Sequence, residues 1–139
     1  KDYRFIGQNG EHTLADLFSD RSQLLVYHFM FGPDWQAGCK SCSFWVDNFE
    51  GIAPHLAARD ISLVLVSKAA WPKLRAYQVR MGWTLPWVSS EKSDFNEDFG
   101  VTHPAGSDTV YNYRPSQVEG EMPGISVFSK DSDGVVYHH

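Results

Sequence analysis

Runs of hydrophobic residues, separated by polar breaks, divide the chain into alternating strands and helices. Two short stretches, 23–31 (QLLVYHFMF) and 61–67 (ISLVLVS), are almost continuously apolar, which predicts strands covered on both faces of a sheet. From Cys42 to Leu56 the apolar residues recur instead at spacings of three and four, which predicts a helix. A second helix is predicted over 71–81, with a proline in its first turn and a glycine after its end.

Shorter patterns account for the remaining sequence. Asn9-Gly10 predicts an N-terminal hairpin, because this pair tolerates the positive φ of a tight turn. Thr13 is placed to cap a short helix, LADLF, and LPWVSS and SDFNEDFGV predict a third strand and one helical turn. An Asp-Gly pair joins two β runs near the C-terminus. Residues 102–121 lose periodicity, so a long loop insertion, mobile or functional, is expected there.

The order of these elements predicts the fold class. Strand–helix–strand units require parallel strands joined by right-handed crossovers, whereas hairpins are antiparallel. We therefore expect an α/β protein with a mixed β-sheet flanked by helices and an N-terminal β-hairpin extension, forming a single domain over residues 1–139. Trp45, Trp83 and Trp87 are expected in the core, since an aromatic residue on a helix face usually packs.

Composition and charge narrow the possible partners. The 139 residues are 42% hydrophobic, enough for a core without disulfides or metal. A net charge of −5 without a basic run argues against nucleic acid, and no stretch reaches the roughly 18 apolar residues of a membrane span. Two cysteines are too few for a secreted disulfide framework. A cytoplasmic location is therefore expected, although a start at Lys1 leaves room for a missing N-terminal piece.

Several sequence blocks resemble a known superfamily. A C-x-x-C between a buried strand and the first turn of a long helix is similar to the thioredoxin arrangement. The hairpin followed by TLADLF, and SVFSKDSDGVVY near the end, resemble its peroxiredoxin and membrane-anchored thioredoxin branch. YHFMFGPDW, GCKSCSFW, RMGW, PWVSS, SDFNEDFG and GISVF together resemble an uncharacterised thioredoxin-like family. The resemblance implies a thioredoxin-like fold and a thiol redox role, and it implies a truncated or tagged C-terminus because more chain normally follows VYH.

The two cysteines, Cys39 and Cys42, carry the predicted chemistry. The first thiol is expected at the helix N-terminus, where unpaired N–H groups and the helix dipole stabilise a thiolate. Lys40 adds a nearby positive charge. Cys39 is therefore the expected nucleophile and Cys42 the resolving thiol of a thiol–disulfide oxidoreductase. No cofactor is implied, the expected partner is a protein or small-molecule thiol or disulfide, and the sequence leaves the oligomeric state open.

Three further residues are candidates for supporting roles. By the resemblance to thioredoxin, His28 falls at the position of a buried acid that moves the proton of the second cysteine. The alternative is a core histidine whose ring bonds a backbone carbonyl. Pro123 is the candidate for the cis-proline that thioredoxin-like proteins place opposite the sulfurs. Trp35, four residues before Cys39, is expected to line the approach to its sulfur.

Three alternatives to this function stay open. Peroxiredoxins need a Thr or Ser three residues before the reactive cysteine, where this chain has Gln36, so a peroxidase is less favoured. A zinc site would need ligands besides the cysteines, and the candidates lack ligand-like spacing, so no metal is expected: His28, His55 and His103. A binding module without turnover would use exposed residues of the 102–121 segment, Tyr111, Tyr113 and Arg114.

Overall fold

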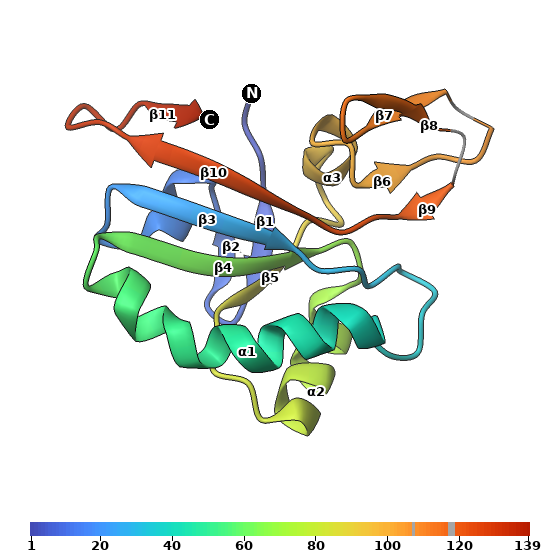
Figure 1. Ribbon diagram of the computed structural model, residues 1–139, viewed down its shortest axis with the longest axis horizontal. Helices are drawn as coiled ribbons and strands as arrows, with labels where there is room; N and C mark the ends of the chain where they lie inside the picture. Colours follow the sequence, from blue (N-terminus) through green and yellow to red (C-terminus); the bar gives the residue numbers. More distant parts are fainter. Residues whose placement is uncertain (107, 117–118) are drawn as a thin grey trace.

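A seven-stranded mixed sheet organises the fold (Figure 1). The computed structural model describes residues 1–106, 108–116 and 119–139. The strand order is β11-β10-β3-β4-β5-β1-β2, with β3–β4 and β4–β5 parallel and the other neighbours antiparallel. The elements of this sheet and its covering helices are β1 (Phe5–Gly7), β2 (Gly10–His12), the 3-10 helix η1 (Ala15–Phe18), β3 (Gln23–His28), α1 (Lys40–Ala57), β4 (Ile61–Ser67), α2 (Trp71–Met81), β5 (Trp87–Ser89), α3 (Phe95–Asp98), β10 (Gly124–Lys130) and β11 (Val136–His138).

The two central strands separate two hydrophobic cores. β3 and β4 pair in parallel from Gln23–Ile61 to His28–Val66, and successive side chains of each strand point to opposite faces. α1 and α2 lie together on one face (Figure 1), over a core that includes Tyr27, Phe29, Cys42, Val46 and Leu65. The core on the other face includes Phe5, Phe18, Val26, Val66, Phe95 and Phe128. Burial on both faces explains why these strands are almost wholly apolar.

Helix α1 packs only part of its expected face on the sheet: Phe49 and Leu56 lie against the core, whereas Trp45 and Ile52 are exposed. It continues through Gly51 and Pro54 to Ala57, and the buried side chains of its first turns are Cys42, Ser43 and Val46. Trp45 is 52% exposed, so its predicted place in the core is wrong, whereas Trp83 and Trp87 are buried as predicted. Among the described residues, no helix is both long and apolar enough to cross a membrane.

Both terminal hairpins form, with one change in the first turn. Gly7 pairs with Gly10, so Gln8 and Asn9 connect β1 to β2, and of the four only Gly10 has a positive φ, +98°. The turn is therefore one residue earlier than predicted. The N-cap of η1 is Leu14, one residue after the predicted Thr13. Thr13 still bonds the first turn: its hydroxyl accepts the Asp16 N–H at 3.2 Å, and the Asp16 carboxylate accepts the Thr13 N–H at 2.8 Å.

The segment expected to be a long loop contains paired strands, so that prediction is wrong for its described residues. β6 (Thr102–His103) pairs with β9 (Gly120–Glu121), and β7 (Thr109–Tyr111) pairs with β8 (Arg114–Ser116). These short pairs lie with α3 beyond the end of the main sheet (Figure 1). Asn112 and Tyr113 both have positive φ, which allows the tight β7–β8 turn.

Glu50 anchors the segment that leads into β5. Its carboxylate accepts the Thr84 N–H at 2.7 Å, the Thr84 hydroxyl at 2.6 Å and the Leu85 N–H at 3.0 Å. Because hydrogen bonds to a charged acceptor are stronger than neutral ones, we expect Glu50→Ala to lower the free energy of unfolding by about 2 kcal/mol. Urea denaturation measures this change. Glu11→Ala, which removes only an exposed ion pair to Arg4, is expected to change stability by less than about 1 kcal/mol. Equal losses in both variants would contradict the anchoring role.

Candidate active site

Cys39 is the N-cap residue of α1. Its backbone is extended (φ −59°, ψ 133°), and its Sγ accepts the N–H of Cys42 at 3.5 Å. Its carbonyl accepts the Ser43 N–H at 3.0 Å and the Ser43 hydroxyl at 2.7 Å. Its own N–H donates to the carbonyl of Met30 at 3.1 Å. The sulfur is therefore held at the positive end of the helix.

The loop before Cys39 is built against β3 and α2. A Cβ on Gly38 would lie 2.6 Å from a ring carbon of Phe29, so a larger residue would push the cysteine away from the sheet. Lys73 of α2 donates to the carbonyls of Pro33 at 2.5 Å and Trp35 at 3.2 Å. Trp35 is 37% exposed within this loop. The loop thus fixes the entry to α1 by packing and by hydrogen bonds from a neighbouring helix.

Cys42 is the buried member of the pair. It is 1% exposed, against partial exposure of Cys39. Burial raises the pKa of the Cys42 thiol to about 11, opposed by hydrogen bonds from the Tyr27 hydroxyl and the Met30 backbone. The neighbouring Cys39 side chain raises this pKa further. The arrangement therefore favours a protonated Cys42 beside an accessible Cys39 sulfur.

Tyr27, which the sequence analysis did not single out, lies in the same core as Cys42. Its side chain is 5% exposed and lies on the α1 face of β3, edge-on to Phe49 with ring centroids 5.2 Å apart. Burial and the hydrogen bond to Cys42 raise the pKa of its phenol well above the usual value. Tyr27 therefore keeps its proton, in the same core as Cys42.

The structure does not bring His28 to the cysteines. His28 follows Tyr27 in β3, so its ring points to the opposite face of the sheet. There its Nε2 lies 2.7 Å from the Ser126 hydroxyl, and the ring stacks on Phe95 and Phe99 at centroid distances of 5.6 and 6.2 Å. Its partner is a serine hydroxyl, and its Nδ1 has no hydrogen-bond partner among the described residues. A proton relay from His28 to Cys42 is therefore wrong.

Pro123 and Lys40 lie at the beginnings of secondary-structure elements. Pro123 directly precedes β10. Within the described residues every peptide bond is trans, so Pro123 is not a cis-proline. The Pro123 carbonyl accepts the Tyr111 hydroxyl at 2.7 Å, which ties β7 to the start of β10. Lys40 is exposed as the first residue of α1, next to Cys39 in the chain.

The two cysteines lie apart from the histidines that the sequence offers as further metal ligands. His55 is in the last turn of α1, 16 residues after Cys39, which separates them by about 24 Å along the helix. His103 lies in β6, with Nε2 2.7 Å from the Gly100 carbonyl. Among the described residues, no three His, Cys, Asp or Glu side chains gather as a metal site would require. The described histidines therefore do not join the two cysteines at one place.

The fold defines the class of protein. Parallel β–α–β units with a cysteine at the N-terminus of the first crossover helix form a thioredoxin-like fold, as predicted. Solved structures share it: peroxidoxin BcpB from Mycobacterium tuberculosis (TM-score 0.66, 16% identity, covering 99% of this chain and 79% of that chain), peroxiredoxin Q from Xanthomonas campestris (0.67, 14%, 97% and 78%), and a putative thiol:disulfide interchange protein DsbE from Chlorobium tepidum (0.60, 15%, 100% and 80%). A search of curated proteins finds no match.

The chain belongs to a family described as "Bacterial protein of unknown function (DUF899)", whose model matches residues 1–139. This membership confirms the resemblance to an uncharacterised thioredoxin-like family. The identities to the solved structures are all 16% or lower, so they establish the fold alone. The function has to be argued from the site of this chain.

Proposed function

We propose that this protein is a thiol–disulfide oxidoreductase, with Cys39 as the attacking thiol and Cys42 as the resolving thiol. The observation that carries the proposal is the position of Cys39, whose Sγ caps α1 beside the buried Cys42. A thiolate is stabilised at such a helix end, and its partner thiol is within one turn of the same helix. The names of solved structures with this fold, peroxiredoxin and thiol:disulfide interchange protein, agree with thiol chemistry in general.

The reaction has two exchange steps. In the first, the Cys39 thiolate attacks one sulfur of a substrate disulfide, forms a mixed disulfide and releases the other sulfur as a thiolate. In the second, Cys42 gives up its proton and attacks Cys39, which closes the Cys39–Cys42 disulfide and releases the second substrate thiolate. Two electrons pass from the dithiol to the substrate, and the released thiolates take up protons. The reverse sequence oxidises a substrate dithiol.

Tyr27 supports the second step of this mechanism. Cys42 must ionise before it attacks, and its burial opposes that charge. The Tyr27 hydroxyl donates a hydrogen bond to the same sulfur, which stabilises the thiolate as it forms. Tyr27 therefore replaces His28 as the proposed residue that assists the resolving cysteine.

We expect Tyr27→Phe to slow disulfide closure about tenfold near neutral pH. The change removes a hydrogen bond that lowers the pKa of Cys42, and loss of about 1.4 kcal/mol is a factor of ten in the thiolate population. The pH midpoint of the closure step is expected to move upward. Stopped-flow measurement of closure after mixing with a reactive disulfide gives the rate and its pH profile.

Tyr77→Phe is the matched control for this prediction. The Tyr77 hydroxyl lies 2.9 Å from the Ser43 hydroxyl and is not bonded to either sulfur. Tyr77→Phe removes the same phenol oxygen from the same core. The rate of disulfide closure in this variant is expected to stay within about twofold of wild type. An unchanged pH midpoint in Tyr27→Phe would remove Tyr27 from the mechanism.

The direct test of the proposed function is reduction of insulin disulfides, with dithiothreitol as the electron source. We expect turnover by the wild-type protein and none by Cys39→Ser. Hydrogen peroxide in place of insulin tests the less favoured peroxidase, for which Gln36 leaves no hydroxyl at the position that peroxiredoxins require. Absence of exchange with insulin and with small disulfides would instead favour a binding module that uses the exposed Tyr113 and its neighbours.

A further inference from the structure

Among the described residues, no strand neighbours the first half of β4 on its β5 side. β5 pairs with β4 only from Leu65 to Ser67, beginning with the Leu65 N–H donated to the Pro86 carbonyl at 2.9 Å. Backbone groups of alternate residues in a parallel ladder point to the same side. The N–H and C=O of Ile61 and Leu63 therefore point to the β5 side, where β5 provides no partner for them.

Three residues keep the chain before β5 away from this edge. Pro86 has no N–H with which to extend the ladder. The N–H groups of Thr84 and Leu85 are both bound by the Glu50 carboxylate, and the Leu85 carbonyl accepts the Gln78 side-chain amide at 2.8 Å. The backbone of 84–85 thus bonds to side chains of α1 and α2. These bonds hold the chain before β5 away from the first half of β4, so the unpaired edge follows from the fold itself.

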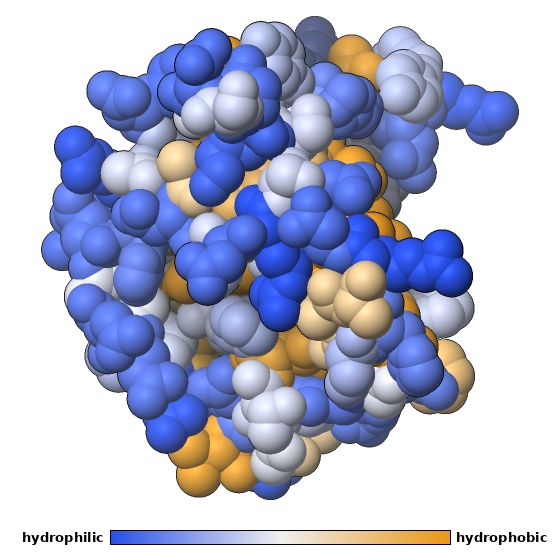
Figure 2. Space-filling view, turned by 90° about the vertical axis from the view of Figure 1, so that its left-hand side faces the viewer, coloured by the Kyte–Doolittle hydropathy of each residue, from blue (hydrophilic) through white to orange (hydrophobic). Residues whose placement is uncertain are grey.

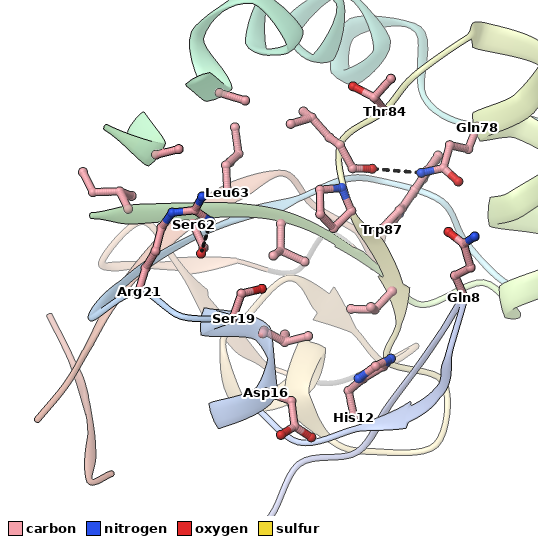
Figure 3. Close-up of a pocket in the computed structure, with 18 of the residues that line it drawn as sticks. Gln8, His12, Asp16, Ser19, Arg21, Ser62, Leu63, Gln78, Thr84 and Trp87 are labelled. Atoms are coloured by element: carbon pink, nitrogen blue, oxygen red, sulfur yellow. Dashed lines mark hydrogen bonds between the residues drawn. The ribbon is translucent and has the colours of Figure 1, made fainter. Parts of the chain in front are cut away.

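A cavity of about 590 Å³ lies along this edge and contains neither cysteine. Ile61 and Leu63 line it, together with Ala57 of α1 and Trp87 of β5, and polar side chains of the N-terminal segment, including Gln8 and Ser19, complete its wall (Figure 3). Figure 2, viewed from the side where β3 and β4 begin, shows apolar side chains at the bottom of a hollow between hydrophilic ones. The volume of the cavity is within the range of ligand sites in proteins.

We propose that this cavity binds an extended peptide segment, which adds a short strand to the free edge of β4. Such a segment supplies alternating N–H and C=O groups that match those of Ile61 and Leu63, and this pairing is the source of affinity in strand addition. The two residues of β4 that offer pairing groups, Ile61 and Leu63, span a length that a peptide of about four residues covers. Successive side chains of the peptide point to opposite walls of the cavity, one wall carrying Ala57 and the other Ser19. Apolar and polar residues are therefore expected to alternate along the peptide.

Amide hydrogen exchange and chemical shifts of the nitrogen-15-labelled full chain test the proposal. The probes are capped tetrapeptides of alternating Val and Thr, in both registers. In the free protein, the Leu63 amide is expected to exchange at least about tenfold faster than that of Val64, which points to β3 and is paired there. Addition of peptide up to about 5 mM is expected to shift the Leu63 amide saturably and slow its exchange.

Matched probes and variants decide the outcome. The same peptides with N-methylated pairing positions lack the donors and are expected not to bind. Ala57→Phe narrows the cavity and is expected to abolish binding, whereas Ala58→Phe, on the exposed neighbouring position, is expected to preserve it. Protection of the Leu63 amide in the free protein, absence of a saturable shift with either register, or equal shifts with the methylated peptides would each overturn the proposal. Insulin reduction does not enter this test, so its result is independent of the proposed redox function.

Discussion

Replacement of Cys39 by serine is expected to lower the rate of disulfide exchange at least about 1000-fold. A serine hydroxyl keeps its proton near neutral pH and is a far weaker nucleophile than a thiolate. Loss of the first attack on the substrate is specific to Cys39, because Cys39 caps α1 and is partly exposed, whereas Cys42 is 1% exposed. Insulin reduction and reaction with a chromogenic aromatic disulfide measure the loss. The change is nearly isosteric, so thermal unfolding is expected to be close to that of wild type.

Cys42→Ser separates the two sulfur roles. This variant keeps the attacking thiol but cannot close the ring, so it is expected to accumulate a mixed disulfide between Cys39 and the substrate. Mass spectrometry of the trapped adduct identifies the attached cysteine. An adduct on Cys39 in Cys42→Ser, with none on Cys42 in Cys39→Ser, is the expected pair of results. Adducts of similar yield in both variants would contradict the assignment of roles.

The free energy of unfolding is expected to fall by about 3 kcal/mol as the pH drops from about 6.5 to about 4, because of His28. Burial, aided by the charge of His138, lowers the pKa of folded His28 to about 4. In this window the unfolded chain binds the proton and the folded chain does not, so stability decreases with falling pH by about 1.4 kcal/mol per unit. Above about pH 6.5 His28 is neutral in both states and contributes no slope.

Urea denaturation across this pH range, in wild type and His28→Gln, isolates the contribution. The glutamine is uncharged in both states, so the difference between the two proteins is expected to vary with pH only below about 6.5. His55→Gln, which replaces an exposed histidine of the same chain, is the matched control. Parallel stability curves for wild type and His28→Gln would show that His28 is not the source of the acid sensitivity.

The fold was predictable because its main elements carry strong local signals. The apolar runs 23–31 and 61–67 contain β3 and β4, and α2 begins beside Pro72 and ends before Gly82 as predicted. The sequence does not show which apolar residues of α1 reach the core, because apolar residues occupy more than one side of the helix. Trp45 belongs to the exposed side, where it stacks on Phe49 with ring centroids 6.2 Å apart. The sequence shows that such a helix is amphipathic but does not fix its rotation.

The sequence singles out the cysteine pair but not the residue that we propose to assist Cys42. A strand that is apolar on both faces has no alternation from which to read the direction of a side chain. Tyr27 and His28 were therefore equally placed by the sequence, and only the structure shows that Tyr27 contacts Cys42 while His28 contacts Ser126. The strands within 102–121 are at most three residues long, too short for a periodic pattern.

The reduction potential of the Cys39–Cys42 pair tests the central claim most directly. The protein is equilibrated with a series of dithiothreitol redox buffers, and the remaining thiols are alkylated and counted by mass spectrometry. The account predicts one two-electron transition, in which both thiols disappear together and Cys39 is joined to Cys42. It also predicts that the transition is absent in Cys39→Ser and Cys42→Ser. A wild-type protein that keeps both thiols alkylatable in the most oxidising buffer, where a reference dithiol protein is fully oxidised, would contradict the account.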